Sequence, residues 1–216
     1  MPKRSYCLKI SIMHIKPPIW RRIVVPADVH LEKLHQIIQK AMGWERIHLY
    51  GFRIAEELYS SNDDSAGFGY GRDLEAKEYI LEDLFPFKGQ SFTYIYDFGD
   101  DWRHKITIED TDYTPNPKKK QIIEDLDDYP VVCISGKRAC PPEDVGGVWG
   151  YYNFCAAIKD FNHPNHEHYV EWYGGDDPND PDFKTYDSEE FSLHSVNWHL
   201  RGILEMPYFR AFGQDS

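Results

Sequence analysis

The sequence contains little cysteine and no long hydrophobic run. Four widely spaced cysteines occur among its 216 residues, without any C-x-x-C pair: Cys7, Cys133, Cys140 and Cys155. This pattern predicts neither a zinc knuckle nor a disulfide scaffold, and it favours reduced, mostly buried thiols. No apolar run approaches the roughly 20 residues needed to cross a bilayer, and the first residues lack the apolar core of a signal peptide. We therefore expect a cytoplasmic protein with no membrane partner.

Glycine-rich phosphate-binding motifs are also missing. Glycines occur at positions 67, 69 and 71, but their spacing does not match G-x-G-x-x-G, and no Gly-Lys-Ser/Thr follows. The polar composition of residues 55–78 instead predicts an irregular surface loop.

Acidic residues are scarce at the start of the chain, although the net charge of the whole chain is −12. Residues 1–53 contain ten lysines and arginines but only three acidic residues. Such a segment can form a nucleic-acid-binding surface, here near Trp20 and Trp44, or it can fold against the acidic remainder. The candidate nucleic-acid contacts are Arg21, Arg22, Lys33, Lys40, Arg46 and Arg53.

The start of the chain predicts two strands, a helix and a third strand. Alternating apolar residues indicate strands over 6–15 and 19–25, which prolines separate. Apolar residues then recur at helical spacing over 31–42, between a predicted N-cap at Asp28 and a stop at Gly43. The alternation returns over 48–54.

In residues 92–110, two alternating runs flank an acidic, glycine-containing turn, which predicts a β-hairpin. Residues 80–85 predict a short helical turn, residues 131–134 an extended segment, and residues 151–160, 163–172 and 191–204 helices. The expected fold is α+β, with an antiparallel or mixed sheet from the β-β-α-β start and the hairpin, and with helices concentrated in the C-terminal third. We expect one domain over residues 1–216, which could divide into lobes of about 1–85 and 86–216.

Several motifs along the chain are long and unusual. They are Lys16-Pro17-Pro18-Ile19-Trp20-Arg21-Arg22, Leu34-His35, Gly43-Trp44 with His48-Leu49, Tyr96-Asp97-Phe98-Gly99-Asp100-x-Trp102-x-His104, Ala139-Cys140-Pro141-Pro142-Glu143-Asp144-Val145-Gly146-Gly147-x-x-Gly150-Tyr151, and Val196-Asn197. In these motifs the chain resembles the plasmid pRiA4b ORF-3-like family, which includes a TnpR-like passenger protein of an insertion element. The resemblance covers nearly the whole chain. It implies an α+β fold in the bacterial or archaeal cytoplasm and an association with mobile elements, but no particular reaction.

Our leading hypothesis is a non-catalytic binding module, whose partner is a protein or a small ligand. Its surface is expected where the hairpin tip at 97–104 meets the loop at 138–150, because a glycine pair before a helix offers free N–H groups and nearby arginines can bind anions. The candidate ligand-binding residues are Asp97, Asp100, Asp101, Trp102, Arg103, His104, Arg138, Glu143, Asp144, Gly146 and Gly147.

The second hypothesis is a metal-dependent enzyme, hydrolase-like, that uses Asp97, Asp100, His104 and Glu143. Histidines and carboxylates can hold zinc, manganese or iron if the hairpin tip meets the histidine-rich segment at 163–168. The candidate metal ligands are Asp97, Asp100, His104, His163, His166 and His168. A third hypothesis is a DNA-associated accessory protein of mobile elements that uses the basic residues named above.

A purely structural role competes with all of these hypotheses. Asp97, Asp100 and Asp101 can accept hydrogen bonds from the backbone of the 139–147 loop, since two irregular segments packed together have many polar groups to satisfy. Arg103 or Arg138 would then pair with Glu143 or Asp144. Cys140 could be an activated thiolate next to Arg138 and His104, or a buried structural residue.

Overall fold

The computed structural model describes residues 4–61, 74–114, 130–175 and 184–205. Its strands are β1 (Ser5–Ile12), β2 (Trp20–Pro26), β3 (Tyr50–Ile54), β4 (Glu57–Ser60), β5 (Leu74–Glu75), β6 (Ser91–Tyr96), β7 (Trp102–Asp110) and β8 (Val132–Lys137). Its helices are α1 (Leu31–Met42), the 3-10 turn η2 (Ala76–Glu78), α2 (Leu81–Leu84), α4 (Gly147–Lys159), α5 (His166–Gly174) and α6 (Leu193–Leu200). The expected α+β class is therefore confirmed.

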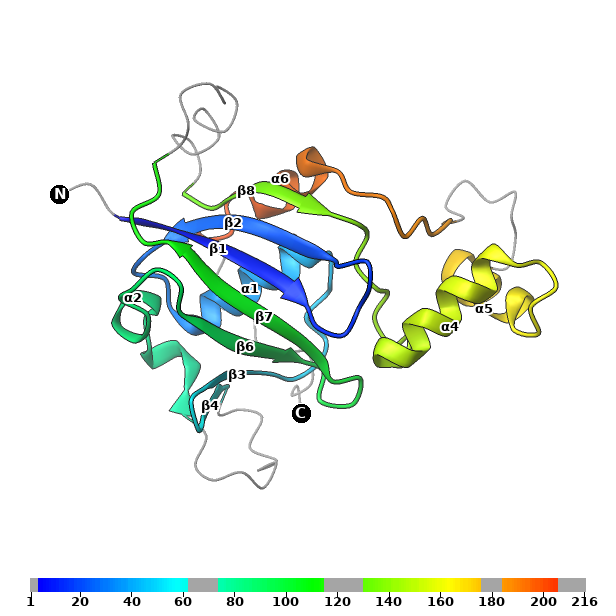
Figure 1. The fold of residues 1–216 in the computed structure, drawn as a ribbon, viewed down its shortest axis with the longest axis horizontal. Coiled ribbons are helices and arrows are strands. Elements are labelled where there is room, and N and C mark those ends of the chain that lie inside the picture. The colour runs from blue at the N-terminus through cyan, green and yellow to red at the C-terminus, as the bar shows by residue number, and fades with distance from the viewer. Residues whose placement is uncertain (1–3, 62–73, 115–129, 176–183, 206–216) are drawn as a thin grey trace, which may run out of the picture.

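All eight described strands form one sheet, in the order β5-β4-β3-β6-β7-β1-β2-β8. Neighbouring strands are antiparallel, except that β4 and β5 are parallel. The predicted hairpin is present as β6 and β7, and it lies between β3 and β1 in the middle of the sheet (Figure 1). The hairpin tip therefore projects from the centre of one sheet end.

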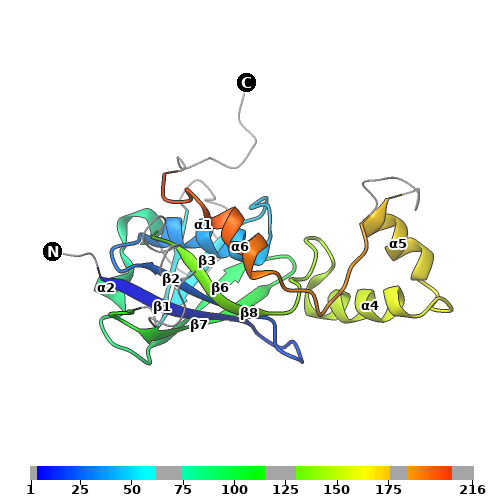
Figure 2. The same cartoon turned by 90° about the horizontal axis from the view of Figure 1, so that it is seen from above.

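Helices α1 and α6 cover one face of this sheet (Figure 2). Helix α1 turns its apolar residues, among them Leu34 and Ile38, toward Leu8, Ile10 and the other inward side chains of the strands. Each such side chain contributes about 1.5–3 kcal/mol when fully buried. The predicted stop at Gly43 is confirmed by its φ of 94°.

The start of α1 differs from our expectation. The residue that precedes the helix is His30, which has extended backbone and makes no side-chain cap, and it bridges to Ile80. A cap at Asp28 was therefore wrong. The strand-like pairing of His30 fixes the entry to the helix, and this long-range contact leaves no local signal in the sequence.

The opposite face of the sheet has no helix over it among the described residues (Figure 2). A small apolar cluster of Cys7, Val24, Val132 and Ile134 covers one corner, where Tyr113 packs on it. Much of the rest of this face is polar, although the buried Leu58 and Ile95 also lie on it, opposite Arg53 and Arg103.

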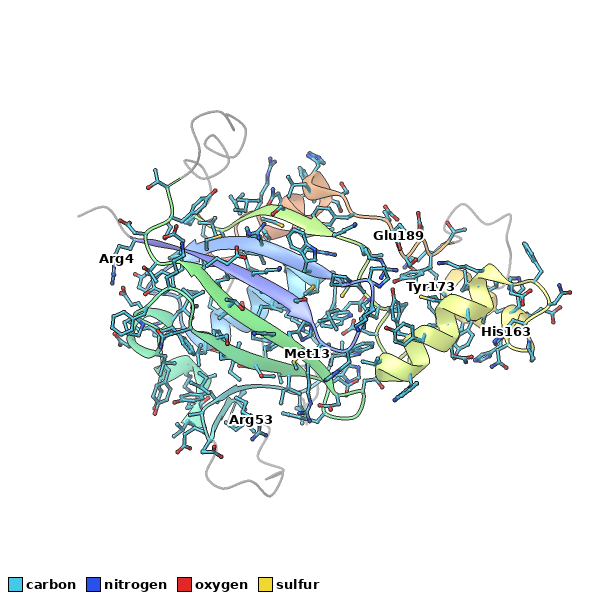
Figure 3. The ribbon with its side chains drawn as sticks, in the orientation of Figure 1. Arg4, Met13, Arg53, His163, Tyr173 and Glu189 are labelled. Atoms are coloured by element: carbon cyan, nitrogen blue, oxygen red, sulfur yellow. The ribbon has the colours of Figure 1, made fainter. Side chains whose placement is uncertain are left out.

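Helices α4 and α5 form an arm that extends beyond one end of the sheet (Figures 1 and 3). Phe154 of α4 is fully buried and packs edge-on against Tyr169 and Trp172 of α5, with Tyr173 and Tyr186 also in contact. The arm thus has an aromatic core of its own, and its first turn lies beside the hairpin tip.

Part of the 55–78 segment was wrongly predicted to be irregular. Residues 57–60 form β4, and residues 74–75 form β5, which pairs with it; residues 62–73 lie outside the described part.

Among the described residues, no helix is long and apolar enough to cross a membrane.

Candidate functional site

Four loops meet at the sheet end from which the hairpin tip projects. The indole N–H of Trp44 donates to the carbonyl of Pro141 at 2.9 Å, and the amide of Asp97 donates to the carbonyl of Leu49 at 2.8 Å. The amide of Lys16, in the β1–β2 turn, donates to the hydroxyl of Tyr152 on α4 at 2.7 Å. Segments that are distant in sequence are therefore tied into one layer, which joins both motifs singled out from the sequence.

Acidic residues of the hairpin tip occupy backbone positions with left-handed φ angles. Asp97 and Asp101 have left-handed φ angles of 53° and 54°, and Asp144 in the neighbouring loop has a φ of 59°. Aspartate tolerates this region better than most residues because its short side chain can bond the local backbone. Asp97 does so by accepting from the amide of Gly99 at 2.9 Å.

Asp100 joins the hairpin tip to α4. Its carboxylate accepts from the amide of Gly146 at 3.1 Å, as the structural hypothesis predicted. Gly147 then packs directly on the hairpin backbone, since a Cβ at this position would lie 2.4 Å from the carbonyl oxygen of Asp100. At Gly150 a Cβ would lie 1.8 Å from the carbonyl of Val145. Close backbone packing therefore explains the glycines of the motif.

The carboxylate of Glu143 also has its hydrogen-bond partners within the protein. It accepts a hydrogen bond from the hydroxyl of Tyr96 and a second bond from the amide of Glu45 at 2.9 Å. Burial and the adjacent Glu143 carboxylate raise the pKa of Tyr96 well above its ordinary value, so the hydroxyl stays a donor. This bond ties the loop to the sheet.

Trp102 and His104, both expected at the site, lie in the core on the α1 side of β7. Burial lowers the pKa of His104 to about 4, so its ring is neutral near pH 7, and its Nδ1 lies 3.0 Å from the carbonyl of Trp102. Neither side chain lines the groove described below.

The suggestion that Arg103 or Arg138 pairs with Glu143 or Asp144 is wrong. Arg103 binds Asp101 through its Nε at 2.8 Å. Arg138 is buried and binds Glu189 and the carbonyl of Pro17 instead. The long connection back from the arm brings Glu189 to this position, which local sequence does not reveal.

An open groove of about 810 Å³ lies between the hairpin tip, the β1–β2 turn and the first turn of α4. Its lining combines hairpin, turn and helix residues: His14, Gly99, Asp100, Asp101, Arg103, Gly146, Gly147, Val148, Trp149 and Tyr152. Trp149 is 86% exposed. Five of the predicted ligand-binding residues line this groove; Asp97, Trp102, His104, Arg138, Glu143 and Asp144 do not.

Sequence reasoning missed Trp149, Tyr152 and His14. A signal for the two aromatics was present, because they lie outside the apolar stripe of α4 that Tyr151 and Phe154 define. Aromatic side chains on the polar side of an amphipathic helix are candidates for contact with a partner. His14 gave no comparable signal.

A separate histidine–carboxylate group lies behind the tip. Nε2 of His48 is 3.0 Å from an oxygen of Asp144 and 3.8 Å from an oxygen of Asp97. Among the described residues, this is the only group of three ligand atoms within 4.8 Å of one another. Asp97 was a predicted metal ligand, whereas His48 and Asp144 were not.

The other predicted metal ligands do not join this group. Asp100 bonds the start of α4 and His104 lies in the core. His163 and His166 are on the arm, where His166 Nδ1 lies 2.7 Å from the carbonyl of Ala157. His168 contacts the ring of Tyr169. The arm histidines thus stay apart from the hairpin carboxylates.

The six basic residues suggested for nucleic acid do not form one surface. Arg21 is buried and donates to the carbonyl of Ala41, and Lys33 is buried against the carbonyl of Ile203. Lys40 lies on α1 and Arg46 in the loop after it. Arg22 and Arg53 lie on the open face of the sheet.

Cys140 is not an activated thiolate. Burial raises the pKa of its thiol to about 12, and the nearby Arg21 offsets this effect only in part. All four cysteines are free, and Cys7 and Cys133 are buried. The structural alternative for Cys140 therefore fits its surroundings.

Comparison with known proteins places the chain in a family. The family model described as "plasmid pRiA4b ORF-3-like protein" matches residues 4–195. A protein of Sinorhizobium fredii, "uncharacterized protein y4hQ", is 36% identical over 191 residues, which are 88% of this chain and 87% of that protein. The crystal structure of a protein of unknown function from Methanosarcina mazei, MM3350, has a TM-score of 0.70 and 32% identity, over 90% of this chain and 98% of that one. The chain therefore belongs to the plasmid pRiA4b ORF-3-like family.

Proposed function

We propose that the protein is a non-catalytic binding module that holds an apolar or aromatic segment of a partner protein in the groove between the hairpin tip and α4. The observation that carries this proposal is the exposed pair of aromatic side chains, Trp149 and Tyr152, on the wall of an open groove. Exposed aromatic rings are the side chains most enriched in energetically important positions of protein interfaces.

The groove is built from firmly held parts, which supports a binding role. Asp100 bonds the amide of Gly146, Gly147 packs on the hairpin backbone, and the hydroxyl of Tyr152 accepts from the amide of Lys16. A preorganised groove loses little conformational entropy when it binds a partner. The motif residues therefore contribute by holding the walls, and the exposed rings supply the contact.

The carboxylates near the groove already have hydrogen-bond partners within the protein, which favours a binding role over acid–base catalysis. Asp100 bonds Gly146, Asp101 bonds Arg103, and Glu143 bonds Tyr96. The four side chains suggested for catalysis have different partners and do not point to one position. They are Asp97, Asp100, His104 and Glu143.

A binding screen with a random peptide library tests the proposal. We expect the wild-type protein to select peptides with aromatic or large apolar residues, and Trp149→Ala to bind them at least 10-fold more weakly. Phe161→Ala is the matched control, because Phe161 is also 86% exposed on the arm but does not line the groove. Equal binding by Trp149→Ala and wild type would refute the proposal.

Metal binding is a second candidate function, which the group of His48, Asp97 and Asp144 favours. Zinc bonds of about 2.0–2.1 Å place tetrahedral ligand atoms about 3.3–3.4 Å apart, and the two observed separations, 3.0 and 3.8 Å, bracket this value. Titration with Zn²⁺ and Mn²⁺ by calorimetry tests the idea. A site here predicts binding that His48→Ala abolishes and His163→Ala leaves intact; identical isotherms for wild type and His48→Ala would exclude it.

A further inference from the structure

The open face of the sheet carries an ordered row of side chains that the proposed groove does not use. Antiparallel register places directly opposed residues on the same face. From β3 to β8 the successive partners are Arg53, Thr93, Lys105, Ser11, Trp20 and Lys137. With strands about 4.8 Å apart, this row spans about 24 Å. Figure 3 looks onto this face and labels Arg53, the first residue of the row, on β3.

A second row runs beside the first. Its successive partners are Ser91, Thr107, Lys9, Arg22 and Ser135. Together the two rows hold five cations, five hydroxyl groups and one indole, and no carboxylate. Glu109 lies next to them and forms an ion pair with Arg22. Lys9, Lys105 and Lys137 form no such pair within 4 Å among the residues that the structure describes.

Positive charge on this face contrasts with the rest of the molecule. The whole chain has a net charge of −12, so the excess acidic charge lies elsewhere. A basic patch on an acidic protein favours an anionic partner at that face. The local attraction there can offset the long-range repulsion between the anion and the rest of the molecule. The hydroxyl groups between the cations can donate to phosphate or base oxygens.

Trp20 adds a contact that a simple anion does not need. Its ring is half-buried within the patch, with Lys9 Nζ 5.4 Å and the Arg22 guanidinium 5.2 Å from the ring centroid. Unpaired bases stack on aromatic rings that lie among cations, and sheet faces with such rings bind single-stranded nucleic acid in known modules. A duplex, whose bases are stacked internally, cannot use this contact.

We propose that the open sheet face, centred on Trp20 with Lys9, Lys105 and Lys137, binds single-stranded nucleic acid. The surface is distinct from the groove between hairpin tip and α4, although the two adjoin at Arg103 on β7. The two proposals can therefore fail separately. The residues involved also differ from the six basic residues suggested by sequence, of which only Arg22 and Arg53 lie on this face.

Fluorescence anisotropy with labelled 12-nucleotide dT and U oligomers, at 50 and 200 mM salt, tests this surface. Each lysine contact to a single strand contributes about 0.7 to the slope of log K against log salt. The triple variant Lys9→Gln, Lys105→Gln, Lys137→Gln should therefore lower the slope by about 2. The control triple variant Lys40→Gln, Lys77→Gln, Lys159→Gln changes net charge equally and should keep the wild-type slope.

Trp20→Leu tests the stacking contact. It should weaken oligomer binding about 5- to 100-fold with little change in salt slope. If the triple variant unfolds, Lys105→Gln alone should lower the slope by about 0.7. Trp149→Ala should bind oligomers as wild type does, which separates this surface from the groove.

Three results would overturn the proposal. The first is no anisotropy change for wild type at 50 mM salt. The second is equal affinity for duplex DNA, which would remove the role of unpaired bases. The third is equal affinity for poly-glutamate together with no effect of Trp20→Leu, which would assign the face to an acidic polypeptide instead.

Discussion

Replacing Gly147 by alanine tests how the motif glycines hold the hairpin tip against α4. The new Cβ would lie 2.4 Å from the carbonyl oxygen of Asp100, a backbone atom that cannot rotate away. The φ of Gly147 is 66°, which costs an L-residue about 1–2 kcal/mol, and overpacking adds about 1–3 kcal/mol. We expect the free energy of unfolding to fall by roughly 2–5 kcal/mol.

Gly146→Ala is the matched control. Gly146 also has a left-handed φ, 91°, but the nearest atom to its Cβ would be 3.6 Å away. Its substitution should cost only the conformational term, about 1–2 kcal/mol. The loss of unfolded-state entropy that accompanies any Gly→Ala change is shared and cancels in the comparison.

Urea denaturation of both variants measures the difference directly, and thermal denaturation should show it as a lower Tm, by about 2–4 °C for each kcal/mol in a chain of this size. Gly147→Ala must be the less stable variant by at least about 1 kcal/mol. Equal stability of the two variants would show that the close approach of Gly147 to the hairpin does not matter, and the reasoning would be refuted.

Three other predictions concern buried groups. Tyr96→Phe removes a donor to Glu143 and should lower stability by about 1–3 kcal/mol in urea denaturation; unchanged stability would mean that the loop does not depend on this bond. His104 and His35 are buried, with pKa values lowered to about 4 and about 3. The unfolded chain therefore binds more protons below its histidine pKa of about 6.5, so the free energy of unfolding should fall between pH 7 and pH 4, by up to roughly 3 kcal/mol for His104, and the urea midpoint should fall with it; a pH-independent midpoint would contradict this. Cys140, with its pKa raised to about 12, should resist iodoacetamide at pH 7.4 until urea unfolds the protein, as followed by mass spectrometry; rapid labelling of the native protein would reinstate a reactive thiol.

Local patterns in the sequence predicted the regular elements well. The hairpin could be read from its alternation and turn residues, and α1 from its apolar spacing and Gly43, because these features depend on neighbours within one element. The end of α1 was predicted correctly and its start was not, since His30 is fixed by a bridge to Ile80 far along the chain.

The candidate site was predictable as a region but not in its contacts. The motifs indicated that the hairpin tip and the glycine-rich loop meet, and Asp100 does bond Gly146. The partner of Arg138 is Glu189, and His48 lies between Asp97 and Asp144; both arrangements arise from packing of segments distant in sequence. The open sheet face required the strand order, since its two rows draw each residue from a different strand.

Chemical-shift mapping by NMR of the ¹⁵N-labelled protein, titrated with a peptide selected by the groove assay, tests the central claim most directly. Binding in the groove predicts shifts of the indole N–H of Trp149 and of the amides of Gly99, Gly146 and Tyr152. Resonances of α6, including the indole of Trp198, should stay in place. Shifts confined to α5 or α6, with the Trp149 indole unmoved, would contradict the account.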